Sequence, residues 1–257
     1  MAKLYISALM LLLTFSQLAA VQDDALIVYF DFEDLSGDIV KDKSGKGNDG
    51  TIVGGDAVVT DGKRGKGLEL DGQDDHVRIE YNESLLLDDA LTFAGWFYFT
   101  NLEPNNNLID TRLPDQWKDA GFNIWIKDAT RDSIISPNAD GWAGTADSKT
   151  SATERTWTHI AMSVDNANGA VSLYLNGSLD SEADVTKGGM GVSEQPMIIG
   201  ARADIQAAKC LYGTMDEIAV WNVALASQEI KTVYQTGIVP VFPAGSISTT
   251  WGNLKSR

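Results

Sequence analysis

The sequence predicts an all-β fold in which two antiparallel sheets form a jelly-roll sandwich, with one short C-terminal helix. Many short segments are rich in apolar and β-branched residues, and several alternate between apolar and polar residues as half-buried strands do. Gly, Asn and Asp mark the turns between these segments, and only one late segment has the spacing of a helix. This combination is typical of a sandwich or jelly roll.

The predicted strands follow one another along the chain and end shortly before the helix. In order, they cover residues 25–32, 67–71, 76–80, 91–100, 121–127, 157–165, 170–176, 178–182, 197–200 and 212–221. Segment 91–100 is largely apolar on both faces, so we expect it in the middle of the sandwich. Segment 121–127 alternates between large apolar and more polar residues, so we expect one of its faces in the core.

The predicted helix begins at Ser227, whose hydroxyl can cap it, and ends before Gly237. Ile230, Val233 and Tyr234 have the i, i+3, i+4 spacing of one helix face. We therefore expect this narrow apolar stripe to lie on a sheet.

Charge and composition exclude several classes of protein. Lys and Arg number 20 against 36 Asp and Glu, a net charge of −16, so nucleic acid is not an expected partner. Cys210 is the only cysteine, which excludes an intrachain disulfide and a cysteine-based zinc site. Hydrophobic residues make up 44% of the chain, enough for a folded core rather than a disordered protein.

The N-terminus has the features of a targeting segment. A basic start at Lys3, an apolar run over 4–13 and the small pair Ala19-Ala20 predict a secretory signal peptide over residues 1–20. The apolar run is too short to span a bilayer, which takes about 20 residues. We therefore expect a secreted or cell-surface protein whose mature chain has no transmembrane segment.

Several segments together resemble the signatures of LamG-like jelly-roll domains, within the concanavalin A-like lectin/glucanase superfamily. They are 42–50 (DKSGKGNDG), 67–77 (GLELDGQDDHV), 91–97 (LTFAGWF), 157–161 (WTHIA), 173–177 (LYLNG) and 213–230 (GTMDEI through EI). They occur in the family's order, although Leu91 and His76 replace the usual aromatic residues. The resemblance predicts a LamG-like domain over 21–238 and a separate C-terminal tail over 239–257. It also implies a curved jelly roll and, in many members, a structural calcium ion.

A calcium site is expected where the first and last strands meet, because these strands often pair in a jelly roll. Calcium prefers carboxylate, amide and carbonyl oxygens. The predicted ligands are Asp31, Glu33, Asp42, Asn48 and Asp216. The alternative for Asp42 and Asn48 is that they only cap turns through the backbone. A second acidic group at Asp71, Asp74 and Asp75 is a weaker candidate.

Ligand binding is expected in the region 101–156, which the resemblance covers least. Trp117, Trp125 and Trp142 lie there among Asn, Asp and Arg residues. An aromatic platform beside hydrogen-bonding side chains is the usual arrangement for sugar recognition. The alternative is that these tryptophans pack as a lid over the core.

A catalytic site is not expected. Residues 69–74 (ELDGQD) come near the E-x-D-x-x-E motif of β-glucanases, but Gly72 turns the chain, so Asp74 cannot share a strand face with Asp71. His159 is expected to be a packed, hydrogen-bonded histidine rather than a catalytic base.

The sequence therefore predicts a secreted, non-enzymatic binding module that recognises glycans or an extracellular protein and carries structural calcium. One alternative is a secreted glycoside hydrolase or polysaccharide lyase with a carboxylate pair, or a Tyr/His pair, in a concave groove. A second alternative is a structural or adhesive surface protein.

Overall fold

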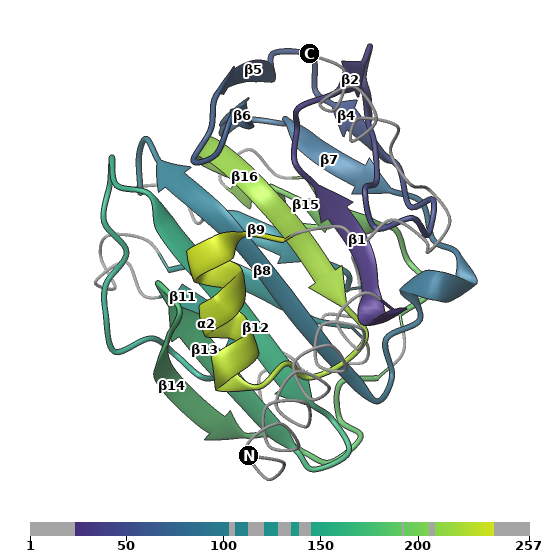
Figure 1. The fold of residues 1–257 in the computed structure, drawn as a ribbon, viewed down its shortest axis with the longest axis vertical. Helices are drawn as coiled ribbons and strands as arrows, with labels where there is room; N and C mark the ends of the chain where they lie inside the picture. Colours follow the sequence, from purple (N-terminus) through teal and green to yellow (C-terminus); the bar gives the residue numbers. More distant parts are fainter. Residues whose placement is uncertain are drawn as a thin grey trace, which may run out of the picture.

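The computed structural model describes residues 24–102, 106–112, 121–127, 135–138, 145–191, 193–205 and 209–238. In this part of the chain two antiparallel sheets of eight strands each pack face to face, and one α-helix lies outside them (Figure 1). The predicted all-β sandwich with a C-terminal helix is confirmed. The predicted signal peptide over 1–20 and tail over 239–257 lie outside the described residues. Among the described helices none is long and apolar enough to cross a membrane.

Sheet A has the strand order β14-β13-β12-β8-β16-β6-β5, and β1 also pairs with β16. Its strands are β1 (Leu26–Phe30), β5 (Val58–Asp61), β6 (Lys66–Asp71), β8 (Ala90–Phe99), β12 (Thr158–Asp165), β13 (Ala170–Leu175), β14 (Ser178–Asp184) and β16 (Tyr212–Trp221). The expected pairing of the first and last predicted strands is confirmed, with Phe30 opposite Ile218. β8 lies between β12 and β16, as its two apolar faces predicted.

Sheet B has the strand order β11-β10-β9-β15-β7-β4-β3-β2. Its strands are β2 (Leu35–Ser36), β3 (Ile39–Val40), β4 (Gly50–Val53), β7 (His76–Ile79), β9 (Asn107–Asp110), β10 (Asn123–Ile126), β11 (Ile135–Asn138) and β15 (Met197–Ile199); a 3-10 turn, η1 (Glu83–Leu85), follows β7. The segment between Asp71 and His76 connects β6 of sheet A to β7 of sheet B. The turn predicted at Gly72 is therefore a crossing between sheets.

The core fills the space between the two sheets. On the inner face of sheet B, Ile124, Ile109, Ile199 and Val77 stand side by side on four adjacent strands. All four are fully buried against the phenylalanines of β8, among them Phe93. Burying each side chain contributes about 1.5–3 kcal/mol, so this row fixes the register of sheet B.

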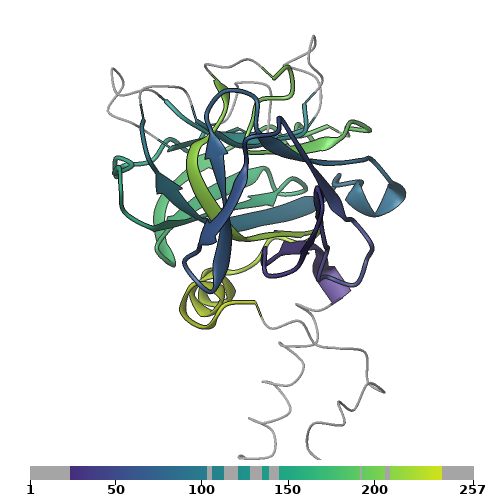
Figure 2. The ribbon, with the colours of Figure 1, turned by 90° about the horizontal axis from the view of Figure 1, so that it is seen from above.

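Helix α2 (Ser227–Thr236) packs on the outer face of sheet A, on the side away from sheet B (Figure 2). Ala161, Ala94 and Ala219 stand opposite one another on three adjacent strands beneath it. These short side chains let the helix approach the sheet closely, and Ile230 and Val233 pack against them. The predicted apolar stripe is confirmed for these two residues, whereas Tyr234 is only half-buried.

Two details differ from the sequence prediction. The cap position of α2 is Ala226, not Ser227, and Glu229 accepts a 2.8 Å hydrogen bond from the Ala226 N–H. The Ser227 hydroxyl instead lies 3.1 Å from the hydroxyl of Tyr174. In addition, β2 to β5, β9 and β11 were not predicted, because strands of two to four residues give little alternation to detect.

Candidate functional site

The outer face of sheet B carries a row of four side chains, three of them polar. Asn123 of β10, Asp110 of β9, Ile198 of β15 and Arg78 of β7 stand side by side. Neighbouring positions along these strands point into the core, so this row points outward. Asn123 and Asp110 are nevertheless 2% and 0% exposed, which shows that further chain covers this part of the sheet.

Asp110 organises the covering chain. Its carboxylate binds Arg112 through Nε at 2.9 Å and Nη2 at 2.8 Å, and also accepts the backbone N–H of Arg112 at 3.0 Å. The same carboxylate accepts the N–H of Ala203, at 3.3 Å, from a distant loop. A buried carboxylate with this many donors fixes two loops at the end of β9 and satisfies the buried Arg112 charge.

Residues 201–205 and 209–210 belong to the second covering segment. Asn107 of β9 donates 2.9 Å to the carbonyl of Lys209, and Ala201 bridges to Cys210. Burial, together with nearby carboxylates including Asp204, raises the pKa of Cys210 to about 12. This thiol therefore stays protonated at neutral pH and packs in a small apolar cluster with Ile198 and Ala201.

Trp125 lies on the same outer face, two residues after Asn123 and opposite Asn107. It is half-buried, so part of the indole is accessible. The amide oxygen of Asn123 is buried and has no hydrogen-bond partner, one of three such side-chain atoms in the described part of the chain. An unpaired buried acceptor costs about 1–3 kcal/mol, which marks the position as a candidate for binding. We call Asn107, Asp110, Arg112, Asn123 and Trp125 the polar face of sheet B.

The other two predicted ligand-binding tryptophans, Trp117 and Trp142, lie outside the described residues. They belong to the segments 113–120 and 139–144, which follow β9 and β11 in the sequence. Their role as sugar platforms remains a prediction.

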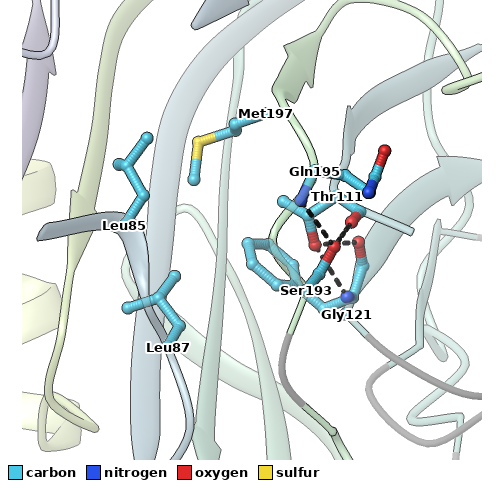
Figure 3. Close-up of a pocket in the computed structure, with 8 residues that line it drawn as sticks. Leu85, Leu87, Thr111, Gly121, Ser193, Gln195 and Met197 are labelled. Carbon is cyan, nitrogen blue, oxygen red and sulfur yellow. Dashed lines mark hydrogen bonds between the residues drawn. The ribbon is translucent and has the colours of Figure 1, made fainter. Parts of the chain in front are cut away.

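A small pocket lies at the ends of the central strands β9, β10 and β15 of sheet B (Figure 3). Leu85, Leu87 and Met197 form one side of it, and Thr111 and Ser193 the other. The Ser193 hydroxyl donates to the carbonyl of Thr111, so this polar side is already paired. The space holds little more than one water molecule, and we do not assign a ligand to it.

The predicted calcium ligands in the loop after β3 have other partners. Asp42 accepts hydrogen bonds on Oδ1 from the N–H groups of Tyr29 and Ser44, at 3.0 and 2.9 Å. Its Oδ2 accepts from the Ser44 hydroxyl at 2.7 Å and the Asn48 N–H at 2.9 Å. Asn48 in turn accepts a 2.6 Å hydrogen bond from the side chain of Asn82. These contacts are those of a turn cap, the alternative for Asp42 and Asn48.

The remaining three predicted ligands also face N–H donors. Asp216 accepts from the N–H of Arg64 at 2.8 Å and of Glu217 at 2.7 Å. Burial is the main cause that raises the pKa of Asp216 to about 7. Asp31 accepts from the N–H of Glu33, and Glu33 from the N–H of Lys66. All five side chains thus use oxygens for protein donors, and calcium binding by this set stays a prediction.

Asp71, Asp74 and Asp75 offer a different arrangement. Each has a carboxylate oxygen within 4.8 Å of the other two, so this cluster could hold a metal ion. Asp75 is fully buried and accepts the N–H groups of Gly55 and Asp56, which holds it in place. Asp74 is exposed, so the cluster is open to solvent on one side.

His159, the histidine considered as a catalytic base, is a packing residue. His159 is buried, as predicted, but its Nδ1 has no hydrogen-bond partner. Burial and the nearby Arg64 charge lower the pKa of His159 to about 3. The ring packs edge-on against Trp96, 5.3 Å between centroids, under helix α2. The predicted packing of His159 is confirmed, and of its two ring nitrogens Nδ1 does not form the predicted hydrogen bond.

The sequence did not single out Asp110, Arg112 or Asn123. Their strands are short, and only the spacing Asp110-Thr111-Arg112 hints at a local ion pair. The outward position of Asn123, by contrast, follows from the alternation in 121–127, where Trp125 shares its face.

Comparison with known proteins agrees with this architecture. Residues 71–231, more than half of the chain, match the family described as the concanavalin A-like lectin/glucanases superfamily. No curated protein matches the chain.

Several solved structures have a similar fold. Domain 4 of AbnA, an extracellular GH43 arabinanase from Geobacillus stearothermophilus solved with arabinotriose, has a TM-score of 0.60 and 21% identity, covering 82% of this chain and 98% of that one. The binding domain of Paraclostridial Mosquitocidal Protein 1 has a TM-score of 0.62 and 18% identity, over 82% of this chain and 52% of that one. The binding domain of botulinum neurotoxin DC, solved with SialylT, has a TM-score of 0.59 and 14% identity, over 84% and 52%.

The match spans about half the length of the two toxin domains, and at these identities the likeness shows the fold alone. The family match, in contrast, extends over residues 71–231, which make up most of the domain. The chain belongs to the concanavalin A-like lectin/glucanases superfamily.

Proposed function

We propose that this protein is a secreted, non-enzymatic binding module that recognises glycans on the polar face of sheet B. The observation that carries the proposal is the buried, unpartnered amide oxygen of Asn123 beside the half-buried indole of Trp125. A sugar hydroxyl can donate to the amide oxygen while the ring stacks on the indole. Trp117 and Trp142 are proposed to extend this aromatic surface.

The proposal is supported by the kinds of domain that share the fold. The arabinanase domain was solved with arabinotriose and a toxin binding domain with SialylT, so sugars are ligands of these distant structural neighbours. Secretion is supported by the predicted signal peptide over 1–20.

Binding without hydrolysis is favoured by the carboxylates of the polar face. A retaining glycosidase needs two carboxyl groups about 5–5.5 Å apart, one of them able to give up a proton. Asp110 is instead held by two nitrogens of Arg112 and by the N–H of Ala203, so its oxygens are already paired with protein donors.

A glycan array on the mature protein, with hydrolysis assays on each bound glycan, tests the proposal. We expect binding without product release. Trp125→Ala should weaken binding at least tenfold, whereas Trp157→Ala, a half-buried tryptophan beside Tyr98 in sheet A, should not. Hydrolysis would favour the enzyme alternative, and binding indifferent to Trp125 would move the site elsewhere.

Calcium is proposed as a structural ion at Asp71, Asp74 and Asp75. This cluster follows directly from β6 and leads into β7, so an ion there would join the two sheets. The cluster is preferred to the residues of the first and last strands because its three carboxylates come within 4.8 Å of one another. Both sets also accept hydrogen bonds from N–H donors, as Asp216 does from Arg64 and Asp75 from Gly55.

A further inference from the structure

Four basic side chains around the polar face of sheet B are each held by a carboxylate. Arg112 binds Asp110 through two nitrogens, at 2.9 and 2.8 Å. Arg202 binds Asp204 in the same two-pronged way, at 2.7 and 2.6 Å. Each guanidinium group already uses two N–H donors for a protein carboxylate. These are the donors that the carboxylate or sulfate of a sugar would bind.

Two more pairs complete this set. Arg78, in the outward row of sheet B, binds Glu80 at 2.6 Å, and Lys127, two residues after Trp125, binds Asp147. An anionic ligand would therefore have to displace a resident carboxylate at every one of these four cations. Displacement leaves the protein carboxylate without its partner. This cost cancels most of the binding free energy that the new ion pair with the ligand would supply.

The carboxylates Asp110 and Asp204 at this face are likewise already hydrogen-bonded to protein donors. Asp204 gives both oxygens to Arg202, and Asp110 serves Arg112 and the N–H of Ala203. A cationic sugar therefore meets the same obstacle as an anionic one. Hydroxyl groups, in contrast, can use acceptors such as the Asn123 amide oxygen without breaking an ion pair.

The described chain near this face adds negative charge. Acidic groups close to Cys210, including Asp71 and Asp204, raise the pKa of its thiol. The potential on this side therefore opposes the approach of an anionic glycan.

We infer that the polar face of sheet B selects neutral oligosaccharides and rejects glycans that carry carboxylate or sulfate groups. The inference rests on the proposed glycan-binding function and names the class of sugar. The ion pair between Arg202 and Asp204 is the specificity-determining contact, because both side chains remain partly exposed, unlike the buried pair of Arg112 and Asp110.

An array with neutral, sialylated or uronate-containing, and amino-sugar oligosaccharides tests the selection on the mature protein. We expect binding to the neutral set, with an affinity that changes less than twofold between about 50 and about 500 mM NaCl because no charge is neutralised. Preferred binding of either charged set would overturn the selection while leaving glycan binding intact. Binding to none of the three would overturn the proposed function itself, and the selection with it.

Asp204→Asn provides the sharper test. This variant removes the carboxylate that holds Arg202, and it should raise affinity for sialylated or uronate glycans about tenfold, the worth of one charge-assisted contact. Asp34→Asn is the matched control, since it makes the same charge change at an exposed pair with Lys43. A gain in both variants, or in neither while neutral sugars still bind, would show that Arg202 and Asp204 do not set the selection.

Discussion

The phenol of Tyr29 on β1 donates a 2.9 Å hydrogen bond to the carboxylate of Glu217 on β16. This contact joins the first and last strands of the domain, which pair as antiparallel neighbours. Burial raises the pKa of both groups. Their hydrogen bond therefore replaces part of the water that each side chain loses on folding. Glu217 also has a positive φ of 52°, at the bulge where β16 shifts register against β8. The contact therefore stabilises an irregular backbone as well as a strand pair.

Tyr29→Phe should lower the free energy of unfolding by about 1–3 kcal/mol, because it leaves a part-buried carboxylate without its donor. Urea unfolding measures the change. Tyr81→Phe is the control, on a tyrosine outside the buried clusters. Equal stability of the two variants would show that water replaces the phenol at no cost.

Asp216 should give the domain an unusual dependence on pH. Its pKa is raised from 3.8 to about 7, mainly by burial, so the folded state keeps a proton that the unfolded state releases. The stability from this group is full below pH 3.8 and is lost as pH rises through about 7. Asp49, whose pKa Lys41 lowers, contributes in the opposite direction.

Asp216→Asn should therefore flatten the fall in stability between about pH 4 and pH 7, measured as the difference in slope from the native protein. The slope is the relevant quantity, since the amide also changes the contacts with Arg64 and Glu217 at every pH. Identical slopes would show that backbone donors keep the carboxylate ionised despite its burial.

Ile230→Ala should remove the main anchor of α2 on sheet A. Ile230 is 1% exposed over the alanine row, and truncation of such a side chain costs about 2–5 kcal/mol. Lys231→Ala, at the next and exposed position of the helix, should change stability by less than about 0.5 kcal/mol. Thermal unfolding compares the two, and similar melting temperatures would mean that α2 contributes little to the domain.

Much of this fold was predictable because it rests on long, apolar strands. β8, β12 and β16 each have eight to ten residues and matched the prediction closely. Sheet B was harder to predict from the sequence. Its strands β9 and β15 have only four and three residues, and they are stabilised by neighbouring strands that are distant in the sequence.

The candidate site was predictable only in part, for the same reason. The alternation of 121–127 placed Trp125 on one face with Asn123, but the partner strand β9 was not predicted. The role of Asp110 depends on Ala203, far along the chain, which no local pattern reveals. For the acidic residues, the sequence favoured those near the paired first and last strands. The group that it ranked second, Asp71 at the end of β6 with Asp74 and Asp75, has carboxylates within 4.8 Å of one another.

Calcium should raise the melting temperature of the native protein through the cluster of Asp71, Asp74 and Asp75, because an ion that binds only the folded state stabilises it. Asp74→Asn should abolish the increase, whereas Asp31→Asn should preserve it. The comparison is made in calcium and in chelator. Loss of the response in Asp31→Asn alone would return the ion to the first and last strands, and no response in the native protein would exclude a structural calcium ion.

Asp110→Ala should lower the free energy of unfolding more than a double variant that removes both Asp110 and Arg112. The single variant leaves the Arg112 guanidinium buried without its carboxylate, which costs about 3–5 kcal/mol. The double variant Asp110→Leu with Arg112→Met replaces both by apolar groups and should recover most of that stability. It cannot recover the hydrogen bond to Ala203, so the segment 201–205 loses its anchor on β9. We therefore expect the double variant to unfold at nearly the native urea concentration and yet to bind neutral glycans more weakly. Native binding by a stable double variant would show that the pair supports the fold alone and does not position the polar face.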